Sequence, residues 1–186
     1  AYEHEFMIIY DEGQTGVGMT GKMWAHQIFN SSTRADIISL GKKMQIWGIF
    51  AGKRIDEVEN KVFHESRRLN STWGGNVVDM VRISLYLEII AEEELVNQAA
   101  TNGDYLLAKL HDIQADFDGV IHNVRGRGLF AAFDLLDGST RDTLANLIIT
   151  EGALILGSGN KSIRFRPHLN ITREEIDLAD EIIRRA

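Results

Sequence analysis

Two charged side chains stand where apolar runs of this chain end. Lys42 follows the mostly apolar residues 37–40 and one glycine, and Asp11 follows the apolar residues 6–10. Burial disfavours the ammonium form of a lysine, and the neutral amine that results can attack a carbonyl group. The alternative for Lys42 is a solvated loop lysine, and the neighbouring Lys43 suits that interpretation. Lys42 is therefore a candidate nucleophile, with Asp11 as a candidate partner.

The elements that must position these two residues are predicted to be parallel strands. Residues 6–10 are too short and too continuously apolar for an amphipathic helix, which favours a fully buried parallel strand. Further strands are expected at 37–40 and 46–51, and a short helix at 23–29. The 31-residue interval from Asp11 to Lys42 suits one right-handed strand–helix–strand crossover. Both side chains should then emerge at the same edge of the sheet, where open α/β sheets place their ligands.

The rest of the chain is predicted to add helices and a second, smaller sheet. A long, largely buried helix is expected over 77–93 and another over 94–115. Strands at 120–124 and 129–136 flank the Arg125–Gly128 stretch, and a hairpin joins 153–156 to 162–166. Ser139 or Thr140 is expected to cap a helix that runs to Glu151, between the strands at 129–136 and 153–156. Thr172 is expected to cap the last helix. We therefore predict an α/β fold with two domains, residues 1–95 and 96–186.

Composition excludes several other classes of protein. The 186 residues are 44% hydrophobic and 25% charged, as in ordinary globular proteins, and the net charge of -7 disfavours a nucleic-acid surface. No apolar run approaches the roughly 20 residues of a membrane span, and residues 1–5 do not resemble a signal peptide. With no cysteine there is neither a disulfide frame nor a thiol nucleophile, which fits a cytoplasmic setting. No metal site is predicted.

Several motifs follow one another along the whole chain. The strand end Asp-Glu-x-Gln-Thr-Gly at 11–16 is one, and Asp36, six residues before Lys42, is another. Others are Leu-Asn-Ser-Thr-Trp-Gly-Gly-Asn at 69–76, Arg-Gly-Arg-Gly-Leu at 125–129 and Ile-Arg-Phe-Arg-Pro at 163–167. Together they resemble the motifs of the class III (omega-amino) aminotransferases, which use pyridoxal phosphate. The resemblance implies the C-terminal part of a fold-type I enzyme: a remnant of the mainly parallel large-domain sheet, followed by a small α+β domain.

The resemblance also implies cofactor-binding roles. Lys42 would be the catalytic residue that carries the coenzyme as a Schiff base and then shuttles a proton. Asp11 would face the pyridine nitrogen and keep it protonated, Gln14 would bind the phenolic oxygen, and Thr72 would reach the coenzyme phosphate of the other subunit in a homodimer. Without the resemblance, an aspartate at a strand end is more often a turn or cap residue, Gln14 an ordinary loop amide, and Thr72 a loop-capping residue.

Substrate roles follow in the same way. By its position before Phe-x-Pro, Arg164 resembles the family's arginine that binds the substrate carboxylate. A guanidinium suits that role because it can form two parallel hydrogen bonds with a carboxylate. Asn70 is a second candidate substrate-binding residue. A charged residue of an edge strand is the alternative for Arg164, and loop capping is the alternative for Asn70.

One residue departs from the family pattern. Gly13 stands where the family has an aliphatic side chain, usually valine, packed against one face of the coenzyme ring. Loss of that contact should loosen the coenzyme by roughly 1 to 2 kcal/mol.

The function implied is transfer of the terminal amino group of L-lysine to 2-oxoglutarate, because residues 41–43 and 70–76 are closest to the family members that act on lysine. A 4-aminobutyrate or ornithine-type enzyme of the same family is the alternative. A non-catalytic truncated chain or interaction module is an alternative of another class. We expect the 186 residues to be the C-terminal portion of a longer chain and to be inactive alone.

Overall fold

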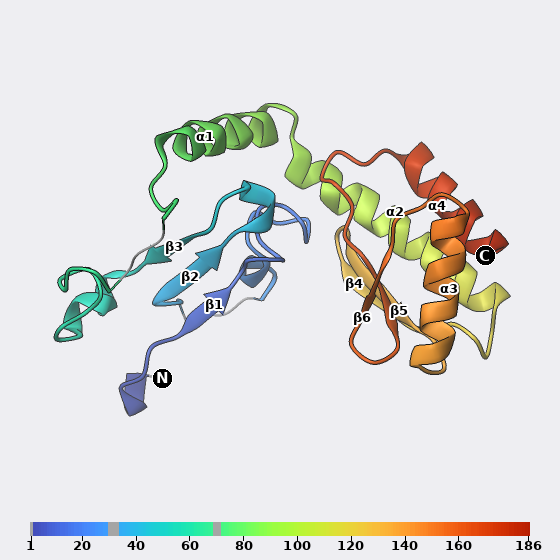
Figure 1. Cartoon of the computed structure of the whole chain (residues 1–186), viewed down its shortest axis with the longest axis horizontal. Helices are drawn as coiled ribbons and strands as arrows, with labels where there is room; N and C mark the ends of the chain where they lie inside the picture. The colour runs from blue at the N-terminus through green and yellow to red at the C-terminus, as the bar shows by residue number, and fades with distance from the viewer. Residues whose placement is uncertain (1, 30–33, 69–71) are drawn as a thin grey trace. The chain divides into compact units, whose positions relative to one another are not determined.

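A computed structural model of the chain describes residues 2–29, 34–68 and 72–186, and these residues form two compact units (Figure 1). The first unit comprises Ala1–Val17 and Trp24–Glu93, and the second comprises Gly18–Met23 and Glu94–Ala186. The short segment 18–23 thus belongs with the C-terminal half, which no local sequence pattern indicates. Assignment of residues 1–95 and 96–186 to the large and small domains of a longer enzyme stays a prediction.

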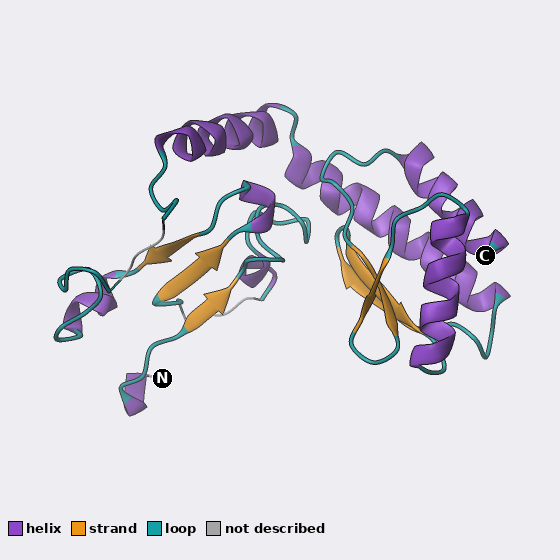
Figure 2. Cartoon of the chain, viewed as in Figure 1, coloured by secondary structure: helices purple, strands orange, loops and turns teal. Residues whose placement is uncertain are grey.

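The first unit contains a three-stranded sheet in the order β1-β2-β3 (Figure 2). Strand β1 (Ile9–Asp11) pairs in parallel with β2 (Ile37–Leu40), and β2 pairs antiparallel with β3 (Gly48–Ala51). Short 3₁₀ helices occupy Tyr2–His4, Ala25–Ile28, Lys42–Met44 and Lys53–Glu57. The parallel pairing of the first two strands was predicted and is confirmed.

The expectation for the first strand of this sheet is wrong. Strand β1 begins at Ile9 rather than residue 6, and it is not fully buried, since Ile9 is 60% exposed. The short helix expected over 23–29 forms as the 3₁₀ helix Ala25–Ile28, which is the only helix among the described residues that connect β1 to β2. An apolar sequence indicates which residues gain from burial. They become buried only where another layer of secondary structure covers the sheet.

Helix α1 (Val77–Glu92) forms where it was predicted, with Asn76 as its N-cap. The side chain of Asn76 accepts a hydrogen bond from the Val78 N–H at 2.9 Å. The helix is not largely buried, however: Ile90 is its one buried residue, and Val77 is 75% exposed. None of the helices within the described residues is long and apolar enough to cross a membrane.

The second unit is an α+β structure in which helices lie beside a sheet (Figure 1). The sheet has four antiparallel strands in the order β4-β5-β7-β6. Helix α2 packs on α4, β4 and β5, and α3 packs on β6 and β7. The bounds are α2 (Leu95–Asp116), β4 (His122–Arg127), β5 (Phe130–Asp134), α3 (Gly138–Thr150), β6 (Leu156–Ser158), β7 (Ser162–Phe165) and α4 (Arg173–Arg185). The last two strands form the predicted antiparallel hairpin, but its first strand is Leu156–Ser158 rather than 153–156.

The helix caps of the second unit and the position of its first turn were predicted only in part. Thr172 caps α4 as predicted, in a capping box with Glu175. Helix α3 is capped instead by Asp137, whose carboxylate accepts from the Thr140 N–H at 2.8 Å. The Arg125–Arg127 stretch lies inside β4, because the turn to β5 is made by the two residues that follow it.

Segment 18–23 joins the second unit through close backbone packing. The Leu129 N–H donates to the Met19 carbonyl at 3.0 Å. Gly128, at a φ of +54°, presses against this segment, and a Cβ at Gly103 of α2 would lie 2.2 Å from the Gly128 carbonyl carbon. Glycine is required at both positions, since no side chain fits between these backbones.

A buried carboxylate ties the strands of the second sheet together. Asp134 accepts hydrogen bonds from Ser162 Oγ at 2.6 Å, Arg125 Nη1 at 2.8 Å and Asn123 Nδ2 at 2.8 Å. Burial acts to raise the pKa of Asp134, but these donors and the arginine charge outweigh it and lower the pKa to about 2. The ionised form of Asp134 therefore stabilises the fold.

We expect Asp134→Asn to lower the free energy of unfolding of the chain by about 2 kcal/mol at pH 7. Because the folded-state pKa lies below the unfolded value, the contribution of Asp134 is complete above about pH 4 and is lost as the pH falls toward 2. Urea unfolding at pH 7 and an acid titration followed by circular dichroism measure both effects. The exposed Asp118→Asn is the control, and equal stability of the two variants would contradict the role.

Candidate active site

The carboxyl ends of β1 and β2 bring the predicted nucleophile and its partner to one edge of the sheet. Asp11 is the last residue of β1 and lies in register with Ser39 of β2. Lys42 follows β2 after Gly41 and begins the 3₁₀ helix Lys42–Met44. The positive charge of Lys42 is close enough to contribute to the pKa of Asp11. The structure thus places both residues where parallel pairing predicted.

Asp11 is held as an ionised carboxylate. Its Oδ1 accepts from Ser39 Oγ at 2.6 Å and from the Gly13 N–H at 3.0 Å. The hydrogen bond from Ser39 lowers the pKa of Asp11 most, and the one from the Gly13 N–H lowers it further. Desolvation acts to raise this pKa, and the positive charge of Lys42 lowers it by a smaller amount. Both of these contacts with described residues use Oδ1, which leaves Oδ2 as an acceptor for a ligand.

Lys42 has an unusual backbone conformation for a residue with a side chain. It is half-buried, and its φ of +36° lies in the left-handed region. The Gln45 N–H donates to the Lys42 carbonyl at 3.0 Å, which closes the turn. Such a conformation costs on the order of 1 kcal/mol and persists only where the surroundings fix it. The direction in which Lys42 leaves the sheet is therefore set by the turn.

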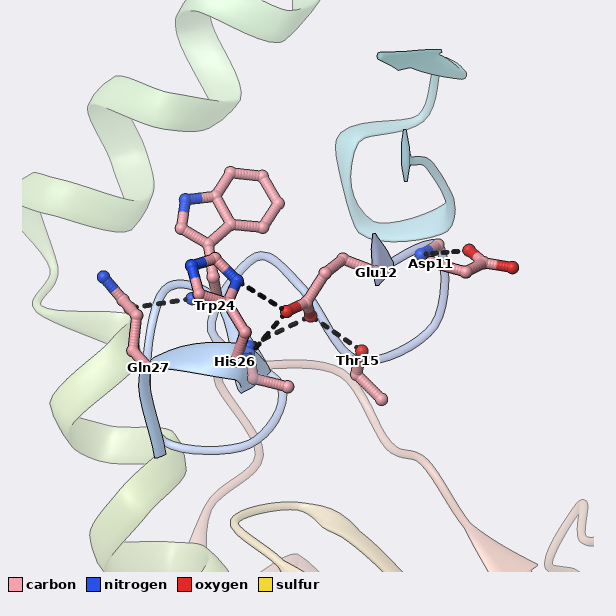
Figure 3. Close-up of polar contacts among 8 residues, drawn as sticks. Asp11, Glu12, Thr15, Trp24, His26 and Gln27 are labelled. Atoms are coloured by element: carbon pink, nitrogen blue, oxygen red, sulfur yellow. Dashed lines mark hydrogen bonds and ion pairs between the residues drawn. The ribbon is translucent and has the colours of Figure 1, made fainter. Parts of the chain in front are cut away.

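Glu12 is buried beside Asp11 and organises the loop that follows (Figure 3). Its carboxylate accepts from Thr15 Oγ1 at 2.7 Å, from the Ala25 N–H at 3.0 Å and from the His26 N–H at 2.8 Å. Burial acts to raise the pKa of Glu12, but the hydrogen bonds outweigh it and lower the pKa. Sequence inspection left Glu12 without a role, because its partners lie up to 14 residues away.

His26 has a partner that its sequence spacing does not indicate. Its Nδ1 lies 3.1 Å from Glu12 Oε1 (Figure 3). This contact gives His26 a structural role in the loop. Glu12 and His26 together hold the loop that follows Asp11.

Asp36, which defines the spacing to Lys42, serves the opposite end of β2. It is buried, and its Oδ2 accepts from the Ile8 N–H and from Arg54 Nη1, each at 2.8 Å. The Asp36 carbonyl also accepts from the Gly52 N–H at 2.7 Å. Asp36 therefore links the start of β2 to the residues just before β1 and just after β3.

The structure gives only the local position and exposure of Gln14 and Thr72, the other candidate residues that it describes in the first unit. Gln14 is half-buried in the turn that follows Asp11, and Thr72 is exposed in the turn before α1. Asn70 lies outside the described residues. Within residues 2–29, 34–68 and 72–186, no group of three or more His, Asp or Glu side chains is arranged to hold a metal ion.

Arg164 lies in the second unit, on β7. This strand pairs with both β5 and β6, so the alternative that Arg164 belongs to an edge strand is wrong. Arg164 and Arg166 line a largely apolar cavity of about 300 Å³. Among the described residues, Arg166 Nη1 is buried without a hydrogen-bond partner. A cavity with two guanidinium groups can receive a carboxylate that carries an aliphatic chain.

Comparison with known proteins shows the family. A model of the class-III aminotransferases matches residues 1–186, so the chain belongs to that family. It is 44% identical over 184 residues to L-lysine-epsilon aminotransferase of Mycobacterium tuberculosis, covering 99% of this chain and 40% of the relative. It is 37% identical over 169 residues to mitochondrial 4-aminobutyrate aminotransferase of Homo sapiens, covering 91% of this chain and 33% of the relative.

The fold agrees with solved structures. Lysine aminotransferase from M. tuberculosis in the internal aldimine form matches with a TM-score of 0.92 and 43% identity, covering 100% of this chain and 42% of that chain. An S-selective transaminase from Arthrobacter sp. matches at 0.85 and 26% identity, covering 98% and 44%. The predicted α/β fold of these transferases is confirmed. The chain spans about 40% of the length of the curated lysine aminotransferases that it matches.

Members of the family use pyridoxal phosphate, which confirms the predicted cofactor. The described residues fit it. Asp11 offers an ionised carboxylate with a free Oδ2, which suits a protonated pyridine nitrogen. Lys42 supplies a primary amine at the same strand edge, which suits an aldehyde.

Proposed function

We propose that the protein carrying this chain transfers the terminal amino group of L-lysine to 2-oxoglutarate. The parallel pairing that sets an ionised Asp11 beside Lys42 is the observation that carries the proposal. The choice of lysine is supported by 41 to 44% identity to L-lysine-epsilon aminotransferases, against 34 to 37% for 4-aminobutyrate aminotransferases. A 4-aminobutyrate or ornithine-type enzyme remains the second candidate function.

In this proposal each residue has a separate task. Pyridoxal phosphate, when bound, supplies an aldehyde carbon and an electron-withdrawing ring. Lys42 Nζ holds the cofactor and, as a free amine, moves the proton of the substrate carbon that bears the amino group. Asp11 Oδ2 keeps the pyridine nitrogen protonated, and Gln14 binds the phenolic oxygen.

Other parts of the proposal concern the assembly. Thr72 donates to the phosphate bound by the second subunit of a homodimer, and its exposed position before α1 is compatible with that role. Asn70 contacts the substrate. The cytoplasm is the proposed location. Sedimentation of the full protein tests the dimer, and cell fractionation tests the location.

The donor is tested by steady-state assays of the full protein with 2-oxoglutarate and each of L-lysine, L-ornithine and 4-aminobutyrate. We expect the kcat/KM for lysine to exceed the others by about tenfold or more, the size of effect expected from one or two contacts in a substrate pocket. A preference for 4-aminobutyrate would replace the donor but leave the reaction class intact. No glutamate from any donor would refute the function.

Arg164→Lys in the full protein should raise the KM for 2-oxoglutarate about ten- to a hundredfold. A lysine cannot form the bidentate contact, and loss of a charged hydrogen bond costs about 1.5 to 3 kcal/mol. The visible absorbance of the bound cofactor should be unchanged, because Arg164 is assigned to substrate. Arg127→Lys, an exposed arginine of the same sheet, is the matched control. An unaltered KM for the oxo acid would refute the assignment.

A further inference from the structure

An indole ring lies directly against the two glycines that flank the candidate site. A Cβ built at Gly13 would stand 2.9 Å from Cζ3 of Trp47, and one built at Gly41 would stand 2.4 Å from Cε3. Further atoms of the same six-membered ring, Cη2 over Gly13 and Cδ2 over Gly41, lie within 3.4 Å of those positions. The ring therefore spans both glycines, which leave no room for a side chain of their own.

These two glycines are neighbours of the groups that carry the chemistry. Gly41 immediately precedes Lys42, and the Gly13 N–H donates to Asp11 Oδ1. A Cβ at Gly13 would lie 3.1 Å from that same oxygen. The indole of Trp47 is thus placed at the edge of the sheet where Asp11 and Lys42 emerge.

Trp47 is exposed in spite of this packing. One part of its ring contacts the glycine backbones, yet 68% of the residue remains accessible. An indole favours an apolar or aromatic neighbour, with ring centroids about 4.5 to 7 Å apart in favourable pairs. A flat heteroaromatic ring bound between Asp11 and Lys42 would supply such a neighbour.

We propose that Trp47 is a cofactor-contact residue that replaces the side chain missing at Gly13. Its indole forms the apolar wall against which the pyridine ring of the cofactor packs, and Gly13 and Gly41 are small because they must admit it. The inference rests on the proposed function, since it takes the ring to be that of pyridoxal phosphate. The departure of Gly13 from the family pattern is then compensated within this chain.

The test is a double-substitution cycle in the full protein, with the dissociation constant of pyridoxal phosphate as the readout. We expect Trp47→Ala to weaken binding about tenfold and Trp47→Phe to weaken it less, because a smaller ring keeps part of the wall. Gly13→Val should also weaken binding, since the valine displaces the indole. Trp47→Ala added to Gly13→Val should restore affinity to within about threefold of wild type, because valine then supplies the wall. Phe63→Ala, an exposed aromatic of the same unit, is the control.

Quenching of tryptophan emission on cofactor binding gives a second readout, which Trp47→Phe should reduce. Thermal melting without cofactor identifies any variant that fails to fold, and Trp47→Phe keeps the test available if Trp47→Ala does fail. Unchanged or tighter binding by the folded Trp47 variants would overturn the inference, because the indole would then not contact the ring. If the dissociation constants of the variants change as expected but no donor is transaminated, only the proposed function is refuted. Failure of the wild-type protein to bind the cofactor would overturn both.

Discussion

Lys42→Ala in the full protein is expected to lower the rate of glutamate formation from L-lysine by about 10³-fold or more. Loss of a positioned proton-transfer group alone costs about 10² to 10⁴ in rate, and this lysine is also the proposed attachment point of the cofactor. Alanine keeps the Cβ, so the positive φ at this position costs the variant no more than it costs the native residue. Stopped-flow and steady-state assays with lysine and 2-oxoglutarate measure the effect.

Lys43→Ala is the matched control, because it removes the same side chain one position further along the same 3₁₀ helix. We expect it to retain activity within about tenfold of the native protein. Borohydride reduction of the cofactor-loaded protein, followed by peptide mass spectrometry, should locate the pyridoxyl group on Lys42 Nζ. Labelling of Lys43, or full activity of Lys42→Ala, would overturn the assignment.

The 186 residues by themselves are expected to form glutamate from lysine and 2-oxoglutarate no faster than free pyridoxal phosphate does. The candidate residues supply Lys42, Asp11 and Gln14 for the cofactor ring, but only the hydroxyl of Thr72 for a phosphate, and that hydroxyl is proposed to serve another subunit. Phosphates are usually held by several backbone N–H groups at a helix N-terminus. The chain also spans about 40% of the lysine aminotransferases that it matches.

Exposed apolar surface gives this prediction a second consequence. Phe50 of β3 and Val77 and Val81 of α1 are more than half exposed, and such surfaces promote association. We therefore expect the isolated 186-residue chain to self-associate in sedimentation experiments. The catalytic test is single-turnover transfer with added cofactor, compared with the Lys42→Ala form of the same chain. Glutamate well above the free-cofactor background, and dependent on Lys42, would contradict the prediction.

Much of the local structure was determined by the sequence alone. The bounds of β2, the course of α2 and the capping of α4 by Thr172 agree with the predicted strand, helix and cap. These features depend on neighbours a few residues apart, which periodicity and capping patterns record. The meeting of Asp11 and Lys42 could also be predicted, because the separation of two strands limits how they can be connected.

Burial was decided only by the tertiary structure. The apolar pattern of α1 predicts a helix correctly, but the described residues cover only Ile90. The same holds for Ile9, which lies in a predicted strand yet is 60% exposed. Hydrophobicity specifies which face of an element gains from being covered, whereas the covering layer comes from residues elsewhere.

The contacts that shape the candidate site were likewise beyond the sequence. Glu12 binds His26 across 14 residues, Asp36 binds Arg54 across 18, and the indole of Trp47 lies on Gly13, which is 34 residues away. No local spacing relates these partners, because each pair meets only after the strands have paired and the loops between them have closed. The sequence alone therefore determined which residues could do chemistry, and the tertiary structure decided which neighbours hold them in place.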